Sequence, residues 1–177
     1  YQVQIADEKV SLISDWYHMA ILALLDSNSF KSDVKWIAEQ LNIHEKVTEQ
    51  AIERLISVGA IKREKEQIVS TGNLFVDPRG VPSTAVREFH HQILKKADEA
   101  IDMQGLDDRD IASLVMCFDK DKMKAAKEKI KKFREEFEAE FGPSEKATNQ
   151  EVYAMGIQFY QITKFNENKK GIANENK

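Results

Sequence analysis

The chain has 177 residues, of which 42% are hydrophobic and 32% charged, a balance typical of a globular protein with one medium domain or two small ones. No apolar run approaches the roughly 20 residues of a membrane-spanning helix, and no secretory signal begins the chain, so we expect a cytoplasmic protein without membrane contact. The single cysteine, Cys117, excludes an intrachain disulfide and a cysteine zinc cluster, and the formal net charge of -4 means that any nucleic-acid contact must come from a local basic patch.

A first helix is predicted after a polar entry segment. Either Ser14 or Asp15 can cap it by accepting backbone N–H bonds. Its apolar residues recur at helical spacing, namely Trp16, Met19, Ala20, Ala23 and Leu24. A turn-forming stretch from 26 to 29 ends it.

The stretch from Val34 to Gln67 has the pattern of a winged helix-turn-helix. Ser32 or Asp33 can cap a short helix, and Asn42 suits the left-handed position that ends it. Gly59 is a stop signal for a second helix. We expect this second helix at about 45–57 and two short strands, the wing, at 60–63 and 67–70.

The second half of the chain is predicted to be a small α/β module. Residues 71–83 contain glycines and prolines and form the expected linker. The elements expected after it are a long helix at about 84–104, a strand at 109–118, a helix at 119–141 and a strand at 151–163, followed by a disordered tail at 164–177. The predicted fold class is therefore α+β, with a winged helix-turn-helix (1–70) and a helix–strand–helix–strand module for dimerisation or sensing (71–163). Two strands alone are marginal, so further strands must come from the linker, a second copy or a preceding segment.

The second helix and the wing supply the candidates for contact with DNA. A DNA reader needs exposed cations and amides that reach phosphates and base edges. The candidate residues are Lys46, Thr48, Gln50, Arg54, Lys62 and Arg63. Glu45, Glu49 and Glu53 lie among the outward positions and repel phosphate, so the charges of this helix favour the alternative interpretation, a protein-contact scaffold.

The long helix offers a polar cluster that either binds an effector or is structural: Arg87, His90 and Arg109. His90 lies on the apolar stripe and is expected to be a buried, hydrogen-bonded histidine. No zinc-protease, nucleophile-elbow, phosphate-loop or dinucleotide motif is present, so we predict no enzyme activity, no metal site and no cofactor.

The helix at 119–141 has an unusual charge order. Its first half is basic and its second half acidic, whereas the helix dipole favours the reverse. A solvated surface explains this order, and so does an anion bound to the basic half. Antiparallel self-association is a third explanation, because it places the basic half of each helix against the acidic half of its partner. The candidate dimer residues are then Lys127, Lys131, Arg134, Glu135 and Glu138.

The sequence resembles an uncharacterised bacterial family of transcriptional regulators with a C-terminal domain of unknown function. The resemblance extends from about Ser14 to Thr163 and rests on Trp16-Tyr17-His18, Ala20-Ile21, Phe30, Trp36-Ile37-Ala38, Leu41, Leu55, Gly59, the run from Pro82 to His90, Ile93-Leu94, Arg109, Phe133-Arg134, Val152-Tyr153, Ile157-Gln158-Phe159 and Thr163. The last strand departs from the pattern, with Tyr160-Gln161 where an aromatic–proline pair is usual. The resemblance implies that a Cro-like helix-turn-helix precedes this region, which agrees with a chain that opens on Tyr1 rather than Met.

These patterns together predict a regulatory, non-enzymatic protein. The preferred interpretation is the C-terminal part of a bacterial transcription regulator that contributes DNA binding, dimerisation or effector sensing, with double-stranded DNA and a second copy as partners. The alternative is a protein–protein interaction module that uses the winged helix as a scaffold and makes no contact with DNA. A small-molecule site between Arg87, His90 and the sheet is a third possibility.

Overall fold

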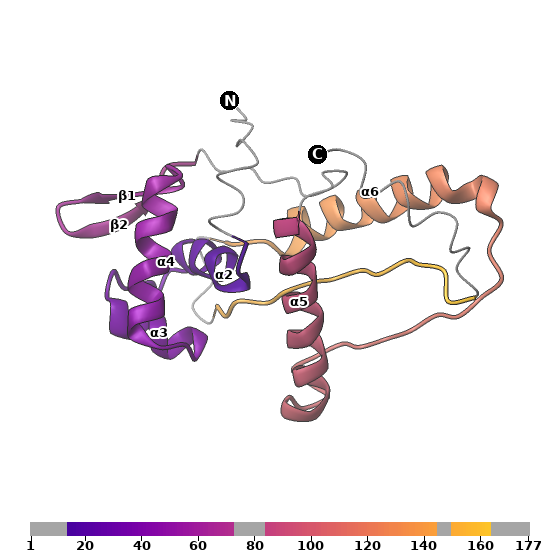
Figure 1. Ribbon diagram of the computed structural model, residues 1–177, viewed down its shortest axis with the longest axis horizontal. Helices are drawn as coiled ribbons and strands as arrows, with labels where there is room; N and C mark the ends of the chain where they lie inside the picture. Colours follow the sequence, from indigo (N-terminus) through magenta and orange to yellow (C-terminus); the bar gives the residue numbers. More distant parts are fainter. Residues whose placement is uncertain (1–13, 73–83, 145–149, 164–177) are drawn as a thin grey trace.

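The computed structural model describes residues 14–72, 84–144 and 150–163. Helices and one small antiparallel sheet make it a mixed α and β structure, as the sequence predicts. The elements are α2 (Trp16–Leu25), α3 (Val34–Leu41), α4 (Glu45–Ser57), β1 (Ile61–Glu64), β2 (Gln67–Ser70), α5 (Thr84–Met103), the 3₁₀ turn η1 (Lys120–Lys122) and α6 (Met123–Phe141). Figure 1 shows α2, α3, α4 and the hairpin gathered at one end, with residues 104–118 and α6 reaching away on the other side of α5. The last extended segment begins beside the first helices, where Oε1 of Gln150 accepts a hydrogen bond from the Asn28 N–H at 2.8 Å, and crosses α5.

Two short helices, α3 and α4, have the ends that the sequence predicts. The Asp33 carboxylate accepts a hydrogen bond from the backbone N–H of Trp36 at 2.6 Å, which caps α3. Asn42 ends α3 in the left-handed region at a φ of 50°. Gly59 has a φ of 79°, and the N–H of Ala60 donates to the Leu55 carbonyl at 2.9 Å, which closes the end of α4.

The hairpin follows directly, and its two strands lie where they were expected. Ile61 pairs with Ser70 and Glu64 with Gln67. The turn residues Lys65 and Glu66 both have positive φ values, which suits a two-residue hairpin turn. β2 is also tied to the helices, because its Ile68 N–H donates to the Ser32 hydroxyl at 2.9 Å.

The hydrophobic core lies among α2, α3, α4 and the hairpin. Its buried members are Ile21, Leu24, Ile37, Ala51, Ile52, Leu55, Val58, Ala60, Ile61 and Ile68. The expected stripe of α2 is wrong in part, since Ile21 and His18 are fully buried whereas Ala23 is exposed. Helical spacing alone did not indicate which face of α2 the neighbouring elements cover.

Helix α5 stands beside this core and matches its predicted range to within a residue. Of its side chains only Val86 is buried. The apolar residues of α5 are therefore spaced along one face of the helix, but most of that face is exposed or half-buried. His90, expected to be buried, is exposed, because nothing described packs over that part of the stripe. Its ring lies against Phe89, with centroids 5.8 Å apart.

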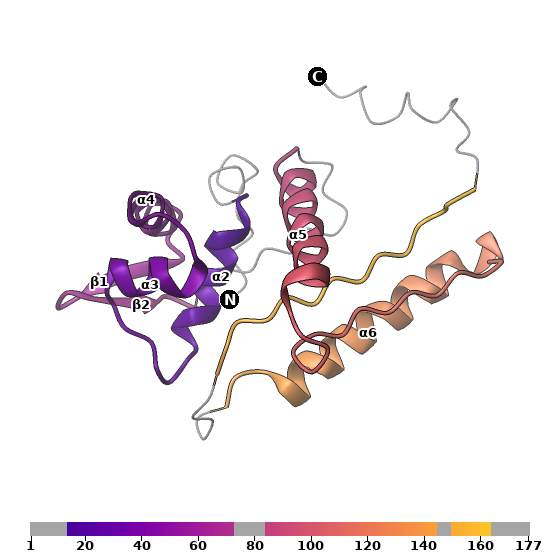
Figure 2. The same cartoon turned by 90° about the horizontal axis from the view of Figure 1, so that it is seen from below.

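The two strands predicted for the second half do not form. Residues 109–118 and 151–163 run as extended segments without a backbone ladder, although α6 between them ends at Phe141 as expected. Figure 2 shows the segment after residue 150 passing α5 and running alongside α6. Apolar residues alternate along 151–163 as in a strand, but a strand needs a partner edge, and neither extended segment pairs with one in the described residues.

Several predictions lie outside the described residues. They concern the entry segment before residue 14, the linker at 73–83 and the tail at 164–177. The domain boundary after residue 70 stays a prediction.

Candidate nucleic-acid interface

The surface around the N-terminus of α4 is shaped by a tight turn between α3 and α4. The Ile43 N–H donates to the Ala38 carbonyl at 3.0 Å, which folds the chain back after Asn42. His44 then starts α4, with its Nδ1 accepting a hydrogen bond from the N–H of Lys46 at 3.1 Å. A sharp turn and two capped helix ends fix the angle between α3 and α4, and so fix which side chains of α4 face outward.

Two of the predicted DNA-contact residues lie on the outward face of α4. Lys46 and Gln50 are both exposed and four residues apart, so their side chains lie on one face of the helix. An ammonium group and an amide in this spacing are suited to a phosphate and a base edge. Glu49 and Glu53, also exposed, lie beside them and oppose a polyanion.

Thr48 does not belong to this face, and its prediction as a DNA contact is wrong. The side chain is fully buried. Its hydroxyl donates to the His44 carbonyl one turn earlier at 3.3 Å, which explains how a polar side chain is accommodated in the core. Thr48 is a structural residue of α4.

The remaining cations of the predicted interface are each engaged with a carboxylate. Arg54 lies 3.6 Å from Asp15. In the hairpin, Arg63 lies 3.4 Å from Glu53 of α4. Lys62 pairs with Glu64 on its own strand. Because these pairs are largely solvent-exposed, each contributes little stability and can exchange for a phosphate.

The charge of the whole surface is balanced. Five acids and five bases lie on α4 and the hairpin: Glu45, Glu49, Glu53, Glu64 and Glu66 against Lys46, Arg54, Lys62, Arg63 and Lys65. The field over this surface therefore provides no net attraction for a polyanion.

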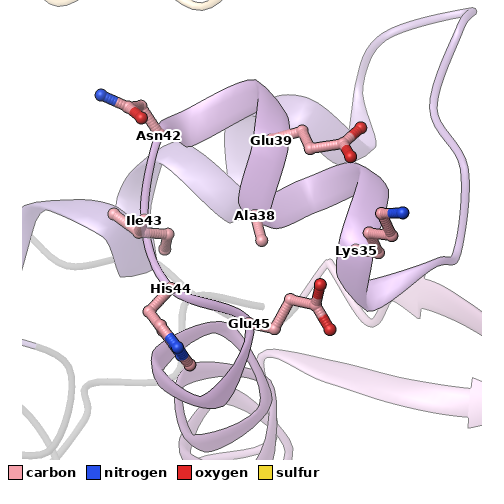
Figure 3. Close-up of a pocket in the computed structure, with 7 residues that line it drawn as sticks. All are labelled: Lys35, Ala38, Glu39, Asn42, Ile43, His44 and Glu45. Carbon is pink, nitrogen blue, oxygen red and sulfur yellow. The ribbon is translucent and has the colours of Figure 1, made fainter.

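An open groove of about 530 Å³ lies where α3 meets the start of α4. Figure 3 shows Ala38 and Ile43 at its apolar side, with the charged ends of Lys35, Glu39 and Glu45 directed outward at its rim. Two carboxylates and one ammonium at the rim disfavour a bound phosphate.

Behind α4 lies a polar cluster centred on Asp15, which the sequence interpretation treated only as a helix cap. Its carboxylate accepts hydrogen bonds from the Tyr17 hydroxyl at 2.7 Å and from Nε2 of Gln92 at 3.0 Å. Burial raises the pKa of Asp15, but the hydrogen bonds from Gln92 and Tyr17 and the nearby His18 and Arg54 outweigh it, so the net pKa lies below its ordinary value.

His18 is the fully buried member of this cluster. Its Nδ1 donates to the Asp15 carbonyl at 3.1 Å, and within the described part of the chain its Nε2 has no hydrogen-bond partner. Burial lowers the pKa of His18, only partly offset by the hydrogen bond to the Asp15 carbonyl. His18 is therefore a neutral core residue at pH 7.

The cluster also joins α2 to α5. Oε1 of Gln92 accepts a hydrogen bond from the backbone N–H of Trp16 at 3.0 Å, and the Lys96 ammonium lies 4.6 Å from the centre of the Trp16 ring. No sequence signal singles out Gln92 for this contact, because Trp16 and Asp15 are 76 and 77 residues earlier. Asp15 holds the N-cap position of α2, as the sequence predicts, but its side chain makes no capping hydrogen bond.

The predicted cluster of Arg87, His90 and Arg109 is not brought together. Arg87 lies in the first turn of α5, where it donates to the Thr84 hydroxyl at 3.3 Å. Arg109 lies beyond the other end of α5, where it donates to the Ile101 and Gln104 carbonyls at 3.0 Å each. The length of α5 separates them, so they cannot share one ligand. Arg109 instead satisfies carbonyls at the helix C-terminus.

The candidate dimer residues all lie exposed on α6. They are Lys127, Lys131, Arg134, Glu135 and Glu138. Lys131 lies 3.8 Å from Glu135 within the helix. The residues thus form one accessible surface in the single chain.

No group of three or more histidine, cysteine, aspartate or glutamate side chains in ranges 14–72, 84–144 and 150–163 is arranged to hold a metal ion. Among the described helices, none is long and apolar enough to span a bilayer.

Comparison with curated proteins gave no significant match, and neither did comparison with solved structures. One family model, described as a domain of unknown function (DUF4423), matches residues 1–162. This match spans the α2–β2 unit, α5, α6 and nearly all of the last extended segment. The chain therefore belongs to the DUF4423 family.

Proposed function

We propose that this chain is the C-terminal, non-enzymatic part of a bacterial transcription regulator, and that α2 to β2 form a winged helix-turn-helix that contacts double-stranded DNA. The observation that carries the proposal is the exposed pair Lys46 and Gln50 on α4, next to a hairpin that bears Lys62 and Arg63. In a winged helix, the second helix enters the major groove and the hairpin contacts the adjacent backbone. The resemblance to bacterial regulators supports the same function.

The balanced charge predicts that this contact is weak by itself. Arg54, Lys62 and Arg63 must each leave a carboxylate before they can hold a phosphate. We therefore expect a dissociation constant in the non-specific range, about 10⁻⁴ to 10⁻⁶ M, with a shallow dependence on salt. High affinity would then require another DNA-binding unit or a second copy.

Fluorescence anisotropy with a labelled random duplex tests the proposal. Lys46→Glu should weaken binding several-fold, whereas Lys95→Glu, the same charge change at an exposed site on α5, should not. Glu49→Gln removes a carboxylate from the face of α4 and should strengthen binding. If Lys46→Glu and Lys95→Glu weaken binding equally, α4 does not face DNA.

A second function is favoured by the ion pairs and by the groove in Figure 3. In this alternative, α3, α4 and the hairpin serve as a scaffold for protein contacts, and DNA is not bound. Complete absence of salt-sensitive binding by the wild-type chain and by Glu49→Gln would favour the scaffold.

A further inference from the structure

The buried and the exposed apolar residues lie in different parts of the chain. Apart from Val86, every buried core residue in the described ranges lies between positions 18 and 68. Among the described residues, the large apolar side chains that are exposed lie between 94 and 162: Leu94, Ile101, Met103, Leu106, Ile111, Leu114, Val115, Met116, Phe133, Phe137, Phe141, Val152, Tyr153, Met155, Ile157, Phe159, Tyr160 and Ile162. The first unit (α2 to β2, residues 16–70) thus has its own core. The second half, described over 84–144 and 150–163, has exposed apolar side chains but no comparable buried core in those ranges.

Helix α6 carries the most regular part of this surface. Phe133, Phe137 and Phe141 recur every fourth residue, and their ring centroids are 5.9 and 4.8 Å apart. Their exposed fractions are 49%, 40% and 65%. Soluble proteins rarely leave a continuous aromatic ridge of this kind in water unless a partner covers it.

The charges of α6 indicate what that partner is. Lys and Arg predominate up to Arg134, and the next four charged residues, Glu135, Glu136, Glu138 and Glu140, are all acidic. A second α6 in antiparallel orientation places each basic half against an acidic half. A parallel pair would place like charges together. The helix is therefore electrostatically complementary to itself in one orientation only.

The extended segments point to the same partner. Residues 109–118 and 150–163 meet where Phe118 and Phe159 lie edge to face, 4.8 Å between centroids, yet no ladder joins the segments. Met155, Ile157 and Phe159 alternate along one side of the later segment. Such segments leave backbone groups and an apolar side open to strand pairing.

The amount of surface is close to that of a stable dimer. If the fourteen exposed apolar side chains of α6 and the two extended segments each lose roughly 50 Å² of accessible surface, the contact buries about 700 Å² per chain, compared with about 800 Å² per partner in a standard stable interface.

We propose that the second half of this chain completes its core with a second copy of itself, through antiparallel pairing of α6 about a two-fold axis, with residues 109–118 and 150–163 packed in the same interface. This inference does not depend on DNA binding. It assigns the face of α6 that carries Phe133, Phe137 and Phe141 to the homodimer contact.

Paired charge reversals test the proposal by sedimentation equilibrium at low salt. Wild-type chain should be a dimer at micromolar concentration. Glu135→Lys with Glu138→Lys cancels the negative charge of the second half of α6, and Lys127→Glu with Lys131→Glu lowers the positive charge of its first half. Each variant alone should dissociate at least tenfold more readily. An equimolar mixture of the two should restore the dimer, a result that misfolded variants cannot produce.

A matched control separates this effect from net charge. Asp26→Lys with Glu39→Lys changes the charge as much as the first α6 variant, but at exposed sites in the first unit, and should leave the dimer intact. Phe137→Asp should abolish the dimer. The proposal is overturned if wild-type chain is monomeric up to 100 times the tested concentration, if the single variants dimerise like wild type, or if their mixture stays monomeric.

Discussion

Gln92 of α5 completes the N-terminus of α2 at Trp16. Its Oε1 accepts the Trp16 N–H at 3.0 Å, while its Nε2 donates to the neighbouring Asp15 carboxylate at the same distance. One amide thus satisfies an otherwise open helix donor and orients an anion that also faces Arg54. The first unit and α5 are joined at this point.

Replacing Gln92 by Ala should therefore destabilise the chain by about 1–2 kcal/mol, the usual cost of losing a helix cap. Equilibrium urea unfolding measures this change. His91→Ala, at the exposed adjacent position, is the control and should cost less than about 0.5 kcal/mol. Equal costs for the two variants would mean that the junction does not contribute to stability.

Burial of neutral His18 predicts a pH dependence of stability. Its pKa in the folded chain lies below the ordinary 6.5, so below that pH the unfolded chain binds a proton that the folded chain does not. The free energy of unfolding should fall as the pH drops from about 7 toward 5, by no more than about 1.4 kcal/mol per pH unit. Asp15 does not contribute in this window, because its pKa is lowered from 3.8 and both states remain ionised.

Urea unfolding at pH 7.5 and 5.5 checks the His18 prediction. His18→Gln should reduce the difference between the two pH values, and His91→Gln should preserve it. If His18→Gln retains the full wild-type difference, another group causes it.

Thr48 and His90 show where sequence patterns gave incorrect burial. Thr48 lies three, four and seven residues before the buried Ala51, Ile52 and Leu55, so it shares their helical face and is buried although its side chain is polar. His90 lies on a predicted apolar stripe that no described element covers. Caps such as Asp33 and stops such as Gly59 were predictable, because they depend on residues only a few positions away. Whether a side chain is buried depends on the element that packs against it. In the same way, residues 109–118 and 151–163 can pair as strands only where a partner strand lies beside them.

Thr48→Val should leave DNA affinity unchanged and lower stability by about 1 kcal/mol, since it removes one buried hydrogen bond and conserves shape. Anisotropy with duplex DNA and urea unfolding are measured on the same sample. Loss of DNA affinity without loss of stability would return Thr48 to the contact surface.

Gly59→Ala should cost about 1–2 kcal/mol, because a φ of 79° is unfavourable for a residue with a Cβ even where space is open. Gly105→Ala is the control, since Gly105 has no positive φ and its added Cβ would meet only a flexible carboxylate oxygen at 3.3 Å. Thermal unfolding compares the two. A smaller cost at Gly59 than at Gly105 would contradict the assigned helix end.

The central claim is that the first unit has a core of its own and the second half obtains its core from a second copy. Hydrogen exchange measured by mass spectrometry over a range of protein concentrations tests it most directly. Amides in residues 34–70 should be protected equally at every concentration, whereas those in residues 109–118 and 150–163 should gain protection as concentration rises through the dimer range. Protection of the two extended segments that is the same at all concentrations, whether high or absent, would contradict the account.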